Sequence, residues 1–233
     1  MNHHVTDCRL AETSQFDHDC ASAHGKLPCQ SGRSVFIALF TSMWLITVCT
    51  GMTILIRYEN TPGLSANPQV KWPRDSRIPL NTSGATLIVL AHPRCPCTRA
   101  TLRELEWIMT RCRESIRAFV LFIHPDEVDL AWVHSDLWKQ VEAIPAVTAM
   151  ADAGGYEARV LCAQTSGQTL LYDITGTLRF CGGITASRGH SGGNLGRDRI
   201  VELVRGGHNS SAGASDSFVF GCPLFHDCSS DCE

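Results

Sequence analysis

The longest hydrophobic stretch of the chain runs from Val35 to Ile56 and contains no charged residue. A helix needs roughly 20 such residues to cross the hydrocarbon core of a bilayer. The stretch is apolar on every side of a helix, whereas a helix that packs on a soluble core keeps one polar face. A cleaved signal peptide is the alternative, but its apolar region is only about 7–15 residues long and follows a short leader. Because residues 1–34 come first, we predict an uncleaved signal anchor, a single transmembrane helix over residues 35–56.

The segments on either side of this helix are polar. Residues 1–34 predict a disordered tail, and residues 57–84, with four prolines, predict a linker that lifts a domain off the membrane. Basic residues lie on both sides, so the positive-inside rule does not choose an orientation. Because a single-span protein with one large domain after the span commonly exports that domain, we expect a cell-membrane protein with its domain on the extracytoplasmic side.

From Ala85 onward, short apolar runs alternate with amphipathic stretches. Residues 85–91 and 116–124 are continuous apolar runs, which are typical of strands buried on both faces of a parallel sheet. Between them, apolar residues recur at helical spacing up to Cys112, and Pro96 suits the first turn of that helix. The pattern then predicts a helix over 130–141, a strand over 145–152, a short helix over 154–163, a hairpin with strands 168–173 and 176–183, and a helix over 194–207.

This order of elements, β-α-β-α-β-α-β-β-α, defines the expected fold class. Alternating units followed by a hairpin and a helix predict an α/β domain over residues 85–206, with a mixed sheet and helices on both faces. Residues 207–233 follow it as a Cys-rich C-terminal tail.

Composition and charge narrow the function class. The chain has 233 residues, a formal net charge of −3 and 12 cysteines. No charge excess indicates a nucleic-acid partner. The chain is too long and too apolar to be a small disulfide scaffold, so the cysteines need an explanation position by position. The glycine-rich loop 182–196 lacks the Lys-Ser/Thr ending of a phosphate loop, and we expect no cofactor.

The candidate chemistry lies at Cys95-Pro96-Cys97, where the first strand passes into the first helix. Unpaired N–H groups and the positive end of the helix dipole favour a thiolate there, and Arg94 and Arg99 add positive charge. A second thiol two positions on can attack a mixed disulfide formed by the first. We expect Cys95, the earlier and more exposed thiol, to be the nucleophile and Cys97 to be the resolving thiol, with the opposite assignment left open.

The order of elements and the paired-cysteine turn resemble the thioredoxin-like superfamily. "LLYDITGTLRF" (170–180) is similar to the hairpin of the membrane-anchored thioredoxin-like reductases of cytochrome maturation. "HPRCPCTRA" (92–100) and "GGITASRGH" (182–190) together resemble a bacterial group described as RedB-like. The resemblance covers about residues 85–205. It implies a thioredoxin-like fold, an active site at the cysteine turn, and a protein thiol or disulfide as partner.

Two departures from the family pattern keep other functions open. The family has two residues between its cysteines, whereas the single Pro96 here predicts a strained and easily reduced disulfide. The family's cis-proline has no counterpart in residues 165–169. Because two close thiolates also bind Cu(I), a Cu(I)-binding metallochaperone with His92 or His190 as a third ligand is an alternative. A non-catalytic thioredoxin-like binding module is another.

The remaining candidates lie in two later segments. Loop 182–196 carries Arg188 and His190, which can hold an anion or move a proton if the loop approaches the cysteine turn; a mobile surface loop is the alternative. We take both as supporting residues, together with His92, Pro96 and Arg99.

The Cys-rich tail has three open interpretations: a resolving cysteine that visits the Cys95 turn, a metal-binding tail, or a frayed end with incidental thiols. Aromatic residues at 218 and 220 suggest that its first part docks on the domain. We predict that Cys222 is redox-linked and claim no metal site.

Overall fold

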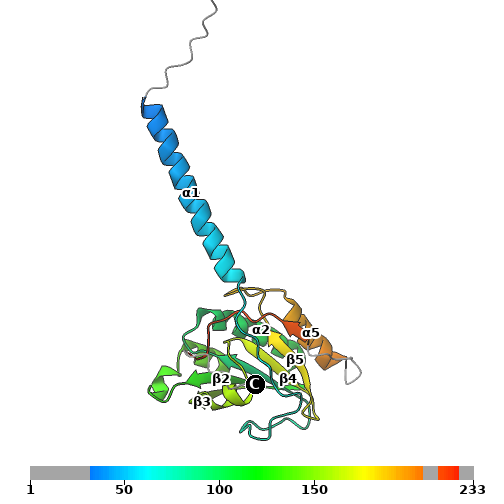
Figure 1. Ribbon diagram of the computed structural model, residues 1–233. Coiled ribbons are helices and arrows are strands. Elements are labelled where there is room, and N and C mark those ends of the chain that lie inside the picture. Colours follow the sequence, from blue (N-terminus) through cyan, green and yellow to red (C-terminus); the bar gives the residue numbers. More distant parts are fainter. Residues whose placement is uncertain (1–31, 207–214, 226–233) are drawn as a thin grey trace, which may run out of the picture. The chain divides into compact units, whose positions relative to one another are not determined.

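The computed structural model describes residues 32–206 and 215–225 (Figure 1). The predictions for the tail before residue 32, and for the cysteines at 228 and 232, lie outside these residues. The chain divides into two units, Met1–Cys49 and Thr50–Glu233. Helix α1 (Gly32–Asn60) begins in the first unit and ends in the second.

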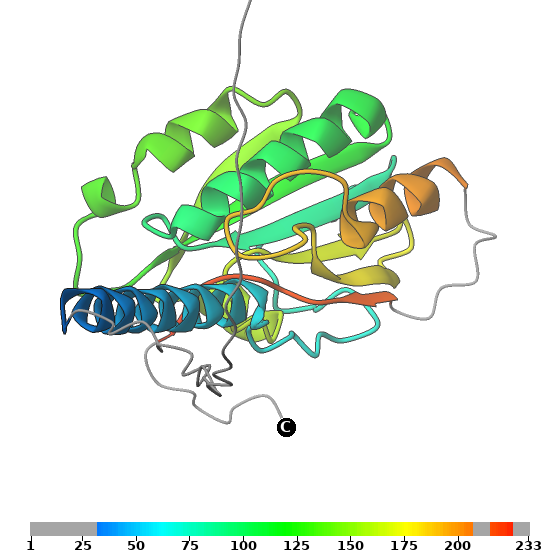
Figure 2. The same ribbon diagram turned by 90° about the horizontal axis from the view of Figure 1, so that it is seen from above.

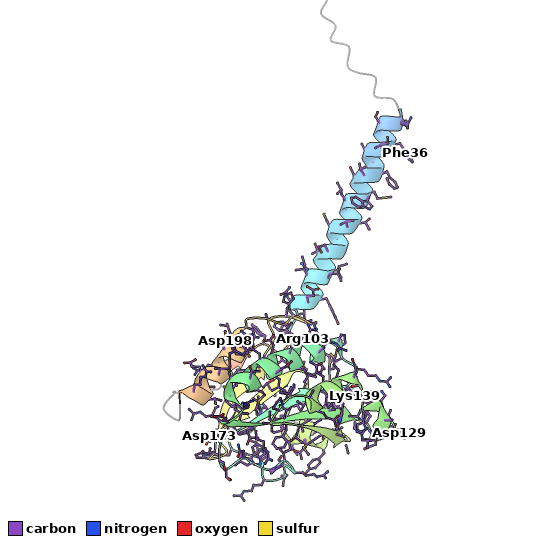
Figure 3. All side chains as sticks on the ribbon, turned by 180° about the vertical axis from the view of Figure 1, so that it is seen from behind. Phe36, Arg103, Asp129, Lys139, Asp173 and Asp198 are labelled. Carbon is purple, nitrogen blue, oxygen red and sulfur yellow. The ribbon has the colours of Figure 1, made fainter. Side chains whose placement is uncertain are left out.

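Helix α1 is longer at both ends than the apolar run that predicts it. At 1.5 Å per residue it is about 43 Å long, more than the roughly 30 Å hydrocarbon core of a bilayer. Its side chains project on all sides, Phe36 among them (Figure 3), and none is buried. Two of its threonines bond their hydroxyls within the helix: Thr41 Oγ1 donates to the Ile37 carbonyl and Thr47 Oγ1 to the Met43 carbonyl, each at 3.0 Å. Among the described residues, α1 is the one helix long and apolar enough to cross a membrane.

The second unit is built on a six-stranded mixed sheet. Its strands are β1 (Ala85–Ala91), β2 (Ile116–His124), β3 (Val147–Ala153), β4 (Gln168–Tyr172), β5 (Leu178–Gly183) and β6 (Ser215–Ser217). They lie in the order β3-β2-β1-β4-β5-β6. The β1–β2, β2–β3 and β5–β6 pairs are parallel, whereas β1–β4 and β4–β5 are antiparallel. β1 is therefore the central strand from which the cysteine turn leaves.

Helices cover both faces of this sheet (Figure 2). The helices are α2 (Pro96–Cys112), α3 (Asp136–Glu142), α4 (Tyr156–Val160) and α5 (Leu195–Arg205). Successive β1 residues point to opposite faces, as strand geometry requires. Leu87 and Val89 pack with residues of α2, α3 and α5, and Ile88 and Leu90 pack with residues around α4. The predicted mixed sheet with helices on both faces is confirmed.

One predicted helix is divided in two. Residues 130–141, expected as one helix, form a short 3-10 helix η1 (Leu130–Trp132) and then α3. The Asp129 carboxylate accepts the Ala131 N–H at 2.7 Å and so starts the first turn. Ser135 then adopts an extended backbone (φ −76°, ψ −179°) before α3 begins. The apolar residues keep their helical spacing across residues 133–135. The sequence pattern therefore did not show that the helix is interrupted there.

Residues 61–84 are packed on the domain instead of forming an extended spacer. Ile78 is 2% exposed and belongs to the cluster around α4. The Glu157 carboxylate accepts the Ser76 hydroxyl and the Arg77 N–H, each at 2.8 Å. Trp72 lies edge-on to Tyr172, with ring centroids 5.0 Å apart. The prolines make this segment irregular. Ile78 buries its surface on the sheet domain, whereas Leu64 and Val70 stay exposed.

Candidate functional site

The cysteine turn lies between β1 and α2. Cys95 precedes the helix with an extended backbone (φ −85°, ψ 122°), and Pro96 fills the first helical turn. Proline suits this place because it lacks the N–H group that would have no partner inside the helix. The Thr98 N–H donates to the Cys95 carbonyl, and the Cys95 N–H donates to the His92 carbonyl, each at 3.1 Å. The expectation that Cys95 and Cys97 stand at a helix N-terminus is confirmed.

Both thiols of the turn are buried. Cys95 is 2% exposed and Cys97 is 7% exposed. Our expectation of open thiols, with Cys95 the more exposed, is therefore wrong. The physical reason is the C-terminal strap, residues 219–225, which lies against the turn (red in Figure 2). Cys222 of the strap places its Sγ 2.9 Å from the Sγ of Cys95.

The strap is held by main-chain hydrogen bonds to the loop before β4. The Ser166 N–H donates to the Cys222 carbonyl at 2.9 Å, and the Leu224 N–H donates to the Gln164 carbonyl at 2.8 Å. The Leu224 side chain is buried in the apolar cluster around α4. Gly221 permits this close approach, because a Cβ at that position would meet the carbonyl group of Ser166. The strap thus pairs with this loop as a short antiparallel strand would.

The three thiols differ in acidity because two of them donate to the third. The pKa of Cys95 is lowered to about 4, and the hydrogen bond from Cys97 is the largest cause. Burial opposes this shift. Hydrogen bonds from the Cys222 thiol and from the N–H groups of Cys222 and Thr98 add to it. The hydrogen bond to Cys95 raises the pKa of Cys97, and burial adds to the effect. Burial, and then the hydrogen bond to Cys95, raises the pKa of Cys222 to about 11. At neutral pH the site holds one thiolate and two thiols.

Arg188 is the predicted supporting residue that reaches this cluster. Its Nη1 donates to the Gly221 carbonyl of the strap. Its positive charge lowers the pKa of both Cys97 and Cys222, although burial and Cys95 outweigh that effect. Its Nε is buried without a hydrogen-bond partner among the described residues. Arg188 therefore joins loop 182–196 to the strap and supplies positive charge beside the sulfur atoms.

The other predicted supporting residues are directed elsewhere. Arg99 forms an ion pair with Asp136 at the start of α3, and both side chains are substantially exposed. His92 Nδ1 accepts the Arg94 N–H at 3.2 Å, and the His92 ring lies edge-on to Trp132 with centroids 5.4 Å apart. His190 is exposed. Cu(I) binding with a histidine ligand stays a prediction.

Sequence reasoning missed a pair of buried hydroxyls that joins the turn to the loop before β4. Thr98 Oγ1 and Ser166 Oγ lie 3.0 Å apart. Thr98 Oγ1 also donates to the His92 carbonyl at 3.1 Å, and the His92 N–H donates to Ser166 Oγ at 3.0 Å. The same loop therefore fixes both the cysteine turn and the strap. The absence of proline there was visible in the sequence, but this meeting of distant segments was not.

Loop 182–196 is anchored by a buried carboxylate. Glu104 of α2 is 3% exposed. It accepts the Gly192 N–H at 2.6 Å and pairs with Arg197 Nη1 at 2.9 Å. The Asn194 side chain accepts the Arg197 N–H at 2.8 Å and so begins α5. The anion that meets this loop is the chain's own Glu104, and an anionic ligand held by Arg188 stays a prediction.

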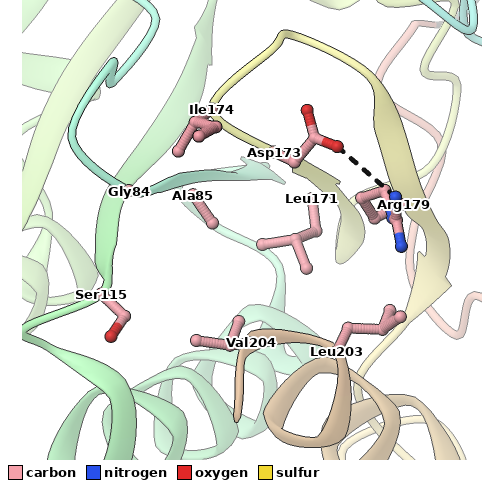
Figure 4. A pocket seen from close by; sticks show the side chains of 9 residues that line it. All are labelled: Gly84, Ala85, Ser115, Leu171, Asp173, Ile174, Arg179, Leu203 and Val204. Carbon is pink, nitrogen blue, oxygen red and sulfur yellow. Dashed lines mark hydrogen bonds and ion pairs between the residues drawn. The ribbon is translucent and has the colours of Figure 1, made fainter. Parts of the chain in front are cut away.

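Two other features of the domain bear on ligand binding. Within residues 32–206 and 215–225, no group of three or more His, Cys, Asp or Glu side chains is arranged to hold a metal ion. A pocket lies at the opposite end of β1 from the cysteine turn, beside Gly84 and Ala85 (Figure 4). Its charged groups are Asp173 and Arg179, which pair with each other at 3.5 Å. It contains no thiol and does not belong to the cysteine site.

The chain is similar to several solved structures. No protein-family model and no curated protein matches the sequence. An uncharacterized conserved protein from Geobacillus kaustophilus is structurally similar, with a TM-score of 0.50 and 14% identity over 73% of this chain and 95% of that one. A hypothetical protein from Sinorhizobium meliloti gives a TM-score of 0.49 and 18% identity over 70% and 93% of the two chains. A secreted Mycobacterium tuberculosis disulfide oxidoreductase, homologous to E. coli DsbE, gives 0.37 and 13% identity over 53% and 82%.

Proposed function

We propose that this chain is a membrane-anchored thiol–disulfide oxidoreductase that acts through the Cys95-Pro96-Cys97 turn. The observation that carries the proposal is the state of Cys95. Its sulfur lies at a helix start, 2.9 Å from a second thiol, and accepts hydrogen bonds that lower its pKa to about 4. The thiolate is the nucleophilic form of cysteine. A thiolate can begin thiol–disulfide exchange by attacking a disulfide, and a neighbouring thiol can end it by resolving the mixed disulfide.

The proposed reaction starts with attack of the Cys95 thiolate on a disulfide of a partner protein. The attacked disulfide breaks, one of its sulfurs leaves as a thiolate, and the other stays joined to Cys95 as a mixed disulfide. Cys97 supports this step because its hydrogen bond stabilises the attacking thiolate. Arg188 supplies positive charge beside Cys97 and Cys222. The reverse sequence oxidises a partner dithiol with the same residues.

The membrane part of the proposal depends on α1. The helix exceeds the thickness of the hydrocarbon core and carries no charged side chain from Val35 to Ile56. We place the protein in the cell membrane as a single-pass chain, with the sheet domain on the extracytoplasmic side. Disulfide chemistry persists in such oxidising compartments.

The test is adduct formation by the full-length chain in detergent. The fully reduced protein is treated with oxidised glutathione, quenched with acid, and digested with trypsin without reduction. Cleavage after Arg94 and Arg99 isolates both turn cysteines in one short peptide. We expect a glutathione adduct or a disulfide at Cys95, lost in Cys95→Ser and retained in Cys112→Ser, which alters a buried cysteine at the far end of α2. A Cys95 that stays a thiol throughout contradicts the proposal.

A further inference from the structure

We propose that Cys222 is the resolving thiol for Cys95, so that oxidation joins the C-terminal strap to the cysteine turn instead of bridging Cys95 and Cys97. This inference rests on the proposed function and names the second catalytic residue of that site. It replaces our expectation that Cys97 resolves.

The first argument is the position of Cys222. Its sulfur is 2.9 Å from that of Cys95, so a bond of about 2.05 Å needs a movement of roughly 1 Å. The main chain around Cys222 is held in place by the rest of the domain. Hydrogen bonds at the Cys222 carbonyl and the Leu224 N–H fix the chain on both sides of the thiol. Arg188 holds the carbonyl of the preceding Gly221. The strap therefore presents this sulfur to Cys95 with its backbone already in place.

The second argument is the position of Cys97. It lies in the first turn of α2, and Pro96 between the two cysteines has a fixed φ. A disulfide between Cys95 and Cys97 would have to bend this rigid turn. The hydrogen bond from the Thr98 N–H to the Cys95 carbonyl also resists that change of the backbone. A hydrogen bond from Cys97 instead lowers the pKa of Cys95. Cys97 is thus a positioning residue that keeps the nucleophile ionised.

The electrons and protons balance with a disulfide as the oxidant. Cys95 first forms a mixed disulfide with the substrate and releases one substrate thiolate, which takes a proton from the medium. Cys222 then loses its proton to a base or water and attacks the Cys95 sulfur. The mixed disulfide breaks, the second substrate sulfur leaves as a thiolate and is protonated, and the Cys95–Cys222 bond forms. One substrate disulfide gains two electrons, which come from Cys95 and Cys222. It also gains two protons, one released by Cys222 and one taken from the medium, because Cys95 is already ionised.

The strap also indicates the shape of the substrate. It pairs with Gln164 and Ser166 through main-chain groups alone, so the same groups can receive any extended peptide that carries a cysteine. Each such hydrogen bond contributes only about 1 kcal/mol net. The hydrogen bonds of the strap around Cys222 are therefore weak enough to be exchanged for those of a substrate. The buried Leu224 and the bond from Arg188 to Gly221 keep the strap close enough to return and resolve the mixed disulfide.

The experiment maps the disulfide in the full-length chain. Trypsin places Cys95 and Cys97 in the peptide 95–99 and Cys222 in the peptide 206–233. After oxidation by glutathione disulfide we expect the wild type to yield these two peptides joined by one bridge. Cys97→Ser should still form it, whereas Cys222→Ser should lose it and accumulate the Cys95–glutathione adduct at least tenfold. Cys228→Ser and Cys232→Ser change the other cysteines of the same tail peptide and should keep the bridge.

The outcomes separate this inference from the proposed function. A bridge confined to peptide 95–99 in the wild type, or a tail bridge that survives in Cys222→Ser, overturns the role of Cys222 and leaves the reaction of Cys95 intact. Failure of Cys95 to form any adduct or bridge overturns the proposed function and this inference together. Mapping the wild type needs no substitution, so the result does not depend on how well a variant folds.

Discussion

The substitution Gly221→Ala tests whether the strap controls access to Cys95. A Cβ at this position would meet the Ser166 carbonyl oxygen and lie 2.8 Å from the Ser166 carbonyl carbon, whereas real Cβ contacts are essentially never shorter than 3.0 Å. Both partners are main chain, so neither can turn aside. The strap must therefore move away from the loop before β4.

The size of the effect follows from the contacts that this movement breaks. The hydrogen bonds from Ser166 to Cys222 and from Leu224 to Gln164 are 2.9 and 2.8 Å long. At about 1 kcal/mol each, their loss weakens docking of the strap by about 2 kcal/mol. That corresponds to a rise of about 30-fold in the fraction of molecules with the strap released.

The assay is the rate at which iodoacetamide alkylates Cys95 at neutral pH, measured by mass spectrometry of peptide 95–99 from the full-length chain in detergent. Because Cys95 is 2% exposed while the strap is docked, we expect the rate to follow the released fraction and rise about 30-fold. The matched control is Gly193→Ala, where the nearest atom to a new Cβ is 3.7 Å away. A Gly221→Ala rate equal to that of the wild type or of the control would refute the reasoning.

Three further predictions concern stability, pH and the membrane. Glu104→Ala removes the buried carboxylate partner of Arg197, which keeps its ion pair with the exposed Asp198, and should cost about 3 kcal/mol in urea unfolding. Glu202→Ala removes an exposed pair and should cost less than about 1 kcal/mol; equal losses would contradict the anchoring role of Glu104. The pKa of Cys95 is far lower in the folded chain than in the unfolded chain, so between these two pKa values only the unfolded chain binds the proton. The stability of the wild type relative to Cys95→Ser should therefore rise from about pH 5 to pH 8. A difference in stability that does not change with pH would contradict an ionised Cys95. The full chain should stay in the membrane pellet after alkaline carbonate extraction, whereas a chain lacking residues 32–56 should be released, and release of the full chain would contradict anchoring by α1.

The parts of the fold that the sequence predicted well are those in which burial is continuous along the chain. β1 and β2 begin and end where their apolar runs do, because a strand covered on both faces admits few polar residues. Pro96 marked the start of α2 for a similarly local reason, since proline lacks the N–H that the first helical turn cannot use. Local patterns also gave the order of the hairpin and the last helix.

The parts that the sequence did not predict depend on contacts between distant segments. Cys222 is 127 positions from Cys95, and no local pattern shows that a strap would bury the turn. Glu104 resembles any charged residue on an amphipathic helix until loop 182–196 folds onto it. Tertiary contacts likewise determine how residues 61–84 pack. The tail nevertheless held two signals in the sequence. Cys222, considered as a thiol that visits the turn, does lie beside Cys95, and of the two aromatic residues expected to dock, Phe220 is buried whereas Phe218 is 68% exposed.

The acidity of Cys95 is the property on which the proposed chemistry most directly depends. It can be measured from the ultraviolet absorbance of its thiolate, as the difference between the wild type and Cys95→Ala over a range of pH. The structure predicts a thiolate signal that is complete at neutral pH and falls to half near pH 4. A signal that instead appears only near the ordinary cysteine pKa of about 8.5 would contradict the account, because the neighbouring thiols would then not be stabilising the nucleophile.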